Sequence, residues 1–320
     1  MSKRLTVSAS PHVRSNETTT GIMLDVIIAL IPALIMSVVY FGTRALALTA
    51  VTVGSAVIAE WISRKVMKRS NTLGDLSAVV TGLILAFNLP ATLPLWMAAV
   101  GSVIAIVVVK QMFGGIGQNF VNPAMTARII LMVSFPTAMA KWVTPFQNCW
   151  SADAVTSATP MATLASAKGG DLSAVADALP TLTDMLLGKH GGSMGEVCSI
   201  ALICGGLYLI LRRVISPIIP LSFIGTVAVL AVLMGQNVGV HLFAGGLMLG
   251  SIFMATDYST SPQTTKGRVI YGIGCGCITM LIRVFGNYPE GVSFAILLMN
   301  IITPHISNLT MSKPIGGAAK

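Results

Sequence analysis

The sequence predicts an all-α integral membrane protein, and its composition and apolar patterning support that prediction. Of its 320 residues, 54% are hydrophobic and only 10% are charged, and the mean hydropathy is +0.82. A soluble domain carries about 25% charged residues, so this chain has too little polar surface to face water on every side. Its longer apolar runs are about 16–20 residues long and do not alternate, which indicates membrane-spanning helices rather than barrel strands.

The apolar runs predict about ten spans, five on either side of one long polar segment. They are expected at residues 22–41, 45–62, 76–89, 95–109, 124–135, 195–211, 218–234, 240–255, 269–285 and 292–302. The predicted parts are a tail at 1–20, a first transmembrane half at 21–136, an outer loop at 137–194, a second half at 195–304 and a tail at 305–320. Because each half has an odd number of spans, the halves enter the membrane from opposite sides, and any duplication must be inverted.

The distribution of lysine and arginine predicts which side of the membrane each segment faces. With the N-terminus inside, fourteen of the twenty basic residues fall in inner segments and five in outer ones, with Arg128 inside a span. Basic residues concentrate in cytoplasmic connections, so both termini are expected in the cytoplasm and the polar segment outside. The same pattern explains the net charge of +9, since the basic residues are not interleaved with aromatics; no nucleic-acid partner is expected.

The cysteines show no metal-ligand spacing. Four of the five lie in apolar runs and none forms a CxxC pair, so no metal site is expected. Cys275 and Cys277 are a weak exception, because two such thiols from different subunits could share a metal cluster.

The polar segment contains Asp153-Ala-Val-Thr156-Ser157-Ala158-Thr159, a small and flexible stretch whose hydroxyls a modifying enzyme could reach. Taken alone, these residues are those of an ordinary loop. The stretch resembles the flavinylation motif D-x-x-[ST]-[GS]-A-T of membrane subunits in the Rnf complex and in the sodium-pumping NADH:quinone oxidoreductase. The resemblance implies that a flavin transferase joins FMN to Thr159 through a phosphoester, and that Asp153 and Thr156 serve its recognition. Thr156-Ser157 stands where the quinone reductase usually has Ser-Gly.

A second candidate site follows the glycine-rich break at residues 114–117. Asn119 and Asn122 lie at the expected inner mouth of a helix, where turn formation and close packing would explain them equally well. In the quinone-reducing relative, two asparagines at this spacing contact a non-covalent riboflavin, so the resemblance implies a riboflavin pocket here. Arg128 is expected to pair with backbone or an acid rather than with a ligand.

A third candidate is Asp257, at the end of an apolar run. Acids within a membrane are costly and usually functional, so Asp257 is a candidate for the ion path. A helix-end cap facing cytoplasmic water explains it equally well. Asp25, Glu60, Glu196 and Glu290 are also expected at helix ends, and none is assigned to an ion path.

The resemblance covers essentially the whole chain, including Met254-Ala-Thr-Asp257 and the following Pro262. The compact length and short tail favour RnfD, the D-type component of Rnf, over NqrB, the longer B-type component of the quinone reductase, which remains the nearer alternative. A small-solute transporter or channel is the alternative from another class.

The resemblance to RnfD implies a fold related to urea and ammonium transporters, in two inverted five-helix halves within the bacterial inner membrane and its lipid. It also implies electron relay between ferredoxin and NAD oxidoreduction, coupled to Na⁺ or H⁺ translocation, with the A, B, C, E and G components of Rnf as partners. No catalytic residue is expected on this chain, because it has no nucleotide-binding domain or cysteine cluster; it would be one component of a translocase.

Overall fold

The computed structural model describes residues 17–147, 149, 156–166, 179–196, 198–286 and 290–311. Within these ranges the regular secondary structure is helical, apart from one isolated antiparallel bridge between Val143 and Thr156. The first half contains α1 (Thr19–Phe41), α2 (Thr43–Val66), η1 (Leu73–Asp75), α3 (Ser77–Phe87), α4 (Leu95–Val103), its π-helical continuation η2 (Ile104–Gln111), α5 (Pro123–Ser134) and α6 (Pro136–Met139).

The polar segment and the second half continue this helical arrangement. Two short helices, α7 (Pro160–Ser166) and α9 (Leu182–Leu187), lie in the polar segment. The second half contains α10 (Ser199–Leu211), α11 (Ile218–Leu233), α12 (Val238–Phe243), α13 (Leu247–Leu249), the π-helical η3 (Gly250–Met254), α14 (Thr265–Phe285) and α15 (Val292–Thr310).

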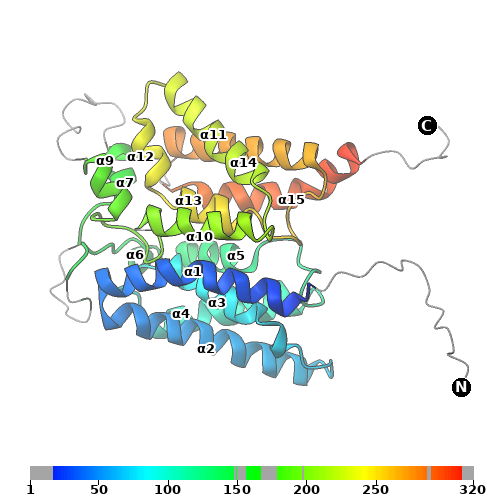
Figure 1. Cartoon of the computed structure of the whole chain (residues 1–320). Coiled ribbons are helices and arrows are strands. Elements are labelled where there is room, and N and C mark those ends of the chain that lie inside the picture. Colours follow the sequence, from blue (N-terminus) through cyan, green and yellow to red (C-terminus); the bar gives the residue numbers. More distant parts are fainter. Residues whose placement is uncertain are drawn as a thin grey trace, which may run out of the picture.

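The helices form a bundle with two distinct ends. The start of α1 and the end of α15 lie at one end, and α7 and α9 lie at the other (Figure 1). We call these the terminal end and the α7 end. In the centre of the bundle α1 packs along α10, so the first helices of the two predicted halves are neighbours.

The helix surfaces support the predicted membrane location. Among the residues that the structure describes, four helices, α1, α2, α14 and α15, are long and apolar enough to cross a membrane, and five apolar stretches are shorter. On α1, Leu30 is fully buried while Ile35 and Val39 are exposed, so this helix is apolar on its outer face as well as its inner face. A helix with apolar residues all round is typical of a lipid surrounding. The all-helical membrane class is therefore confirmed, and the number of spans and their inverted arrangement stay predictions.

The predicted continuous span at 240–255 is wrong, because the chain breaks at Gly245 and Gly246. Their φ angles are +74° and +68°, a left-handed conformation that glycine adopts most readily. The Arg283 Nη2 atom donates to the carbonyls of Ala244 and Gly245 at 3.2 and 3.0 Å. These hydrogen bonds pair the backbone carbonyls at the break. A short helix, α12, therefore precedes the break, and α13 with η3 follows it.

The boundary predicted after residue 304 is also wrong, because α15 continues through Pro304 to Thr310. Proline removes one backbone donor and usually kinks or ends a helix. Here the last turn is anchored by Thr310, whose hydroxyl lies 2.5 Å from that of Thr264, the N-cap residue of α14.

The polar segment is packed onto the α7 end of the bundle. Met161 of α7 and Met185 of α9 form a small buried cluster with Val240 and Ala244, at α12. The segment that holds the predicted flavin acceptor therefore has a fixed position against the membrane helices.

Candidate functional site

The predicted acceptor, Thr159, lies at the start of α7 and is buried. Thr156 pairs with Val143, and the Ser157 amide donates to the Trp142 carbonyl at 3.0 Å. Thr159 is only 4% exposed, and its hydroxyl accepts a hydrogen bond from the Ala162 amide at 3.1 Å. The expectation of a hydroxyl that an enzyme could reach is therefore wrong for this conformation, because α7 packs the threonine against the bundle. Asp153 lies outside the described residues.

The surroundings of Thr159 contain buried polar atoms with no hydrogen-bond partner among the described residues. The Ser157 hydroxyl is one, and it lies so close to Gly191 that a side chain at that glycine would clash with it. The hydroxyl of Thr144 and the Nε2 atom of His190 are two more, and each belongs to a residue next to one that contacts the motif. Since buried polar groups are nearly always paired, these atoms fit a site that a polar ligand completes.

A cluster of buried charges lies beside this segment. Arg128 of α5 pairs with Glu290 and donates to the Asn88 amide oxygen at 2.7 Å, so Arg128 does pair with an acid as expected. Arg283 of α14 donates through Nε to the Glu290 carbonyl at 3.2 Å. Glu196 accepts from the Ser193 hydroxyl at 2.6 Å. The cluster thus contains two arginines and two glutamates, and the sequence did not predict that these four residues come together.

A cavity of about 240 Å³ opens next to the ion pair, and we call it the Arg128 cavity. Trp142, which binds the flavinylation motif through its carbonyl, forms part of the wall. The other lining residues that bear on its chemistry are Arg128, Met132, Met139, Glu290 and Phe294. The cavity therefore combines an apolar and aromatic wall with one buried ion pair.

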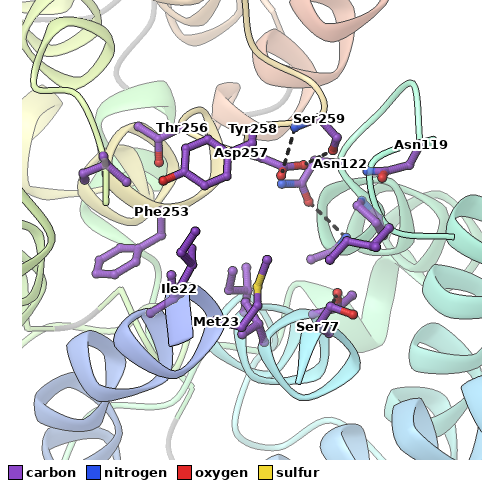
Figure 2. A pocket seen from close by; sticks show the side chains of 18 of the residues that line it. Ile22, Met23, Ser77, Asn119, Asn122, Phe253, Thr256, Asp257, Tyr258 and Ser259 are labelled. Carbon is purple, nitrogen blue, oxygen red and sulfur yellow. Dashed lines mark hydrogen bonds between the residues drawn. The ribbon is translucent and has the colours of Figure 1, made fainter. Parts of the chain in front are cut away.

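A second pocket, of about 120 Å³, lies at the terminal end, and we call it the Asp257 pocket (Figure 2). It brings together Asn119, Asn122 and Asp257, which the sequence indicated as two separate sites. Figure 2 shows Ile22 and Met23 of α1 on the side opposite Asp257. A polar wall thus faces an apolar one, an arrangement typical of sites for amphipathic small molecules.

The two asparagines have structural roles of their own. The Asn122 side-chain oxygen accepts from the Ala124 and Met125 amides at 3.1 and 3.3 Å, which makes it the N-cap of α5. Its amide nitrogen donates to the Met254 carbonyl at 3.3 Å, joining α5 to the end of η3. The Asn119 amide donates to the Val121 carbonyl at 3.2 Å. The Asn119 side chain therefore makes fewer hydrogen bonds to the backbone than the Asn122 side chain does.

Asp257 caps the turn that follows η3 and also lines the pocket. Its carboxylate accepts from the hydroxyls of Ser259 and Thr260 at 3.0 and 3.2 Å. Both interpretations of the sequence, a helix-end cap and a site residue, are thus compatible with its position; its role in an ion path stays a prediction.

A buried ion pair adjoins the Asp257 pocket. Lys110 lines the pocket, and its amine lies 3.0 Å from the Glu60 carboxylate and 2.5 Å from the Ser77 hydroxyl. The Gln111 amide donates to Glu60 at 2.7 Å. The side chains of Glu60 and Lys110 are 0% and 3% exposed. The expectation that Glu60 lies at a helix end is wrong, because α2 continues past it to Val66. The one feature of the sequence that could have indicated this ion pair is the position of Glu60 within an otherwise apolar run.

The cysteines hold no metal site in the part of the chain that the structure describes. There, no group of three or more His, Cys, Asp or Glu residues is placed to bind a metal ion. Cys275 is buried and Cys277 half-buried on α14. Burial raises the pKa of the Cys149 thiol, with Arg44 opposing the shift, so this thiol stays protonated.

The sequence is similar to known proteins along nearly its whole length. The model of the NQR2, RnfD, RnfE family matches residues 6–316. The chain belongs to this family. The resemblance to the NQR2, RnfD, RnfE family is thereby confirmed, and the matched residues of this chain include both candidate sites.

Individual members of the family are close relatives. One, 49% identical over 314 residues, is the D component of the Na(+)-translocating ferredoxin:NAD(+) oxidoreductase complex of Acetobacterium woodii, with 98% of this chain and 95% of the relative covered. Another, 42% identical over 325 residues, is the D component of the Proton-translocating ferredoxin:NAD(+) oxidoreductase complex of Clostridium ljungdahlii, with 97% and 96% covered. A third, 38% identical over 331 residues, is the D component of the Ion-translocating oxidoreductase complex of Halorhodospira halophila, with 94% and 92% covered.

Proposed function

We propose that this chain is the RnfD component of an Rnf-type complex, a membrane flavoprotein that relays electrons between ferredoxin and NAD oxidoreduction and contributes to Na⁺ or H⁺ translocation. The observation that carries the proposal is the 49% identity to the D component of a ferredoxin:NAD(+) oxidoreductase complex across 98% of the chain. This similarity favours Rnf over the quinone-reductase alternative. The A, B, C, E and G components of Rnf would supply the ferredoxin and NAD chemistry.

We propose that FMN is esterified to Thr159. The group would supply one- and two-electron transfer, while the protein supplies position and electrostatics. The orphaned Ser157 hydroxyl and the adjacent Arg128 cavity support the fit, and the exposure of Thr156 supports its role in recognition by a flavin transferase. Because Thr159 itself is buried, we expect the transferase to act before α7 packs against the bundle.

The test is ultraviolet fluorescence of the denatured protein band, from cells that also express a flavin transferase. We expect the wild-type band to fluoresce and the Thr159→Val band to be dark, because the ester survives denaturation and needs this hydroxyl. Thr163→Val is the matched control: its hydroxyl donates to the Pro160 carbonyl one helical turn away, and its band should stay bright. A dark wild-type band, with the transferase active on another target, would contradict the redox function and favour the transporter alternative.

We propose that the α7 end faces outward and that both termini are cytoplasmic. The terminal end and the α7 end lie on opposite sides of the bundle (Figure 1), and basic residues are concentrated in the connections predicted for the inner side. The packing of α1 along α10 is compatible with about ten spans in two inverted halves, related to the urea and ammonium transporters. The outward position would expose the motif to a transferase acting outside the cytoplasm.

We propose that the Asp257 pocket binds riboflavin non-covalently, with Asn119 as a polar contact, and that Asp257 lies on the ion path. Asn119→Leu is expected to remove most of the flavin that acid releases, while the flavin retained in the precipitated protein is unchanged. Chromatography of both fractions measures this. Asn71→Leu, at an exposed position outside the pocket, should release as much flavin as wild type. Unchanged release from Asn119→Leu would contradict this site.

A further inference from the structure

We propose that the buried ion pair of Arg128 and Glu290 sets the reduction potential of the flavin carried by Thr159, and that the flavin ring system occupies the Arg128 cavity. The inference rests on the proposed attachment of FMN and assigns the residues that act on it. Arg128 and Glu290 are positioning residues in this proposal, since their charges act on the flavin without forming a bond to it.

Two independent routes connect the acceptor segment to the cavity. In the first, the Ser157 amide binds the carbonyl of Trp142, which lines the cavity. Thr159 follows Ser157 by two residues, and an extended chain spans at most about 3.6 Å per residue, so the acceptor is within about 7 Å of that contact.

The second route passes through Arg283. A Cβ atom at Gly245 would lie 3.0 Å from the Met161 side chain and 2.6 Å from the Arg283 guanidinium, so α7 and Arg283 meet at this glycine. Arg283 in turn donates to the Glu290 carbonyl at 3.2 Å. Both routes place Thr159 beside the same cavity, within reach of a ribityl chain.

The wall of the cavity suits a flat aromatic group with one polar edge. Trp142 and Phe294 provide aromatic surface, and Met132 and Met139 provide flexible apolar surface. Ligand sites typically combine such walls with a few convergent polar groups. The polar group here is the Arg128–Glu290 pair.

The charges of this pair act strongly on a neighbouring group because Arg128 is buried and the Glu290 side chain is only 13% exposed. Arg128 is only 2% exposed, and its Nε atom has no partner among the described residues. Charges separated from water interact more strongly with a neighbouring group than charges at the surface do. A flavin gains negative charge when it is reduced, so Arg128 favours the reduced form and Glu290 opposes it.

A purely structural role is the alternative, because Arg128 also joins α5 to Asn88 and to the start of α15. The two interpretations predict different patterns of shift in the reduction potential of the flavin. A structural defect would move the potential in the same direction for either variant, whereas the electrostatic role requires opposite shifts from the two charges.

The experiment is a spectroelectrochemical titration of the purified, flavin-loaded protein, with Thr159→Val protein titrated separately to subtract any other flavin. We expect Arg128→Gln to shift the potential of the covalent flavin to more negative values and Glu290→Gln to shift it to more positive values. Arg212→Gln is the matched control: Arg212 pairs with Asp25 near the terminal end and is 59% exposed, so its loss should leave the potential unchanged. Shifts of the same sign, or no shift, in proteins with normal covalent fluorescence would overturn the inference.

A second pair of variants keeps the proposal testable if the charge variants fail to fold. Ala140 is exposed and lines the cavity, whereas Thr137, on the same short stretch, is exposed and does not. Ala140→Phe should shift the visible absorption band of the covalent flavin, and Thr137→Phe should not. An unchanged band in a folded, fluorescent Ala140→Phe protein would place the ring elsewhere. Absence of covalent flavin from wild-type protein would instead refute the proposed function itself.

Discussion

Lys110→Met is expected to destabilise the folded protein by about 3–5 kcal/mol, because it leaves Glu60 as an uncompensated buried charge. Glu60 has no exposed side-chain surface and depends on Lys110 for its counter-charge. Ser77 and Gln111 also bind the pair, so they would lose or misdirect hydrogen bonds as well. The loss should be measurable as a lower melting temperature in detergent, followed by size-exclusion chromatography after heating.

The double variant Glu60→Leu/Lys110→Met separates charge pairing from packing. Replacing both members of a buried ion pair with apolar residues is often neutral, so the double variant should recover most of the lost stability. Lys65→Met is the control, because Lys65 is exposed and stacks on Trp61 near the end of α2. A double variant as unstable as the sum of its single variants would show that the two charges are not coupled.

Much of the helical arrangement could be predicted because the membrane sets the length of apolar runs. The predicted spans at 22–41, 269–285 and 218–234 correspond to α1, α14 and α11 within a few residues. The break at Gly245 and Gly246 was missed, because the hydrogen bonds that stabilise it come from Arg283, 38 residues further along the chain. An apolar run alone does not show where a distant side chain will form hydrogen bonds with the backbone and allow the helix to break.

The sequence predicts the parts of the candidate site that depend on neighbouring residues, and it misses the parts that depend on contacts between distant helices. The motif ending at Thr159 predicts a flavin acceptor from seven consecutive residues, but the burial of Thr159 depends on α7 packing against α12. Asn122 and Asp257 were assigned to different sites because the contact that unites them, from Asn122 to the Met254 carbonyl, spans 132 residues. The partner of Arg128, Glu290, lies 162 residues away. Pairings of this kind follow from helix packing and leave no pattern in residue spacing.

The packing of α1 on α10 leads to a prediction in which the same substitution has opposite effects at two glycines. At Gly205 of α10, an added Cβ would clash with the Ala29 carbonyl of α1 and lie 3.1 Å from the Phe253 ring. We expect Gly205→Ala to destabilise the protein by about 3 kcal/mol, the upper end for overpacking, because a backbone carbonyl cannot rotate away as a side chain can.

Gly225 of α11 provides the matched comparison, since an added Cβ there would meet nothing within 4 Å. Gly225→Ala should therefore stabilise by about 0.5–1 kcal/mol, because alanine loses less conformational freedom in a helix than glycine does. The melting temperature in detergent distinguishes the two substitutions by sign. Equal effects would show that α1 and α10 are not in close contact. Because these are the first helices of the two predicted halves, a clash at Gly205 would also separate those halves, and we expect it to reduce the proposed covalent flavin on Thr159 as well as stability.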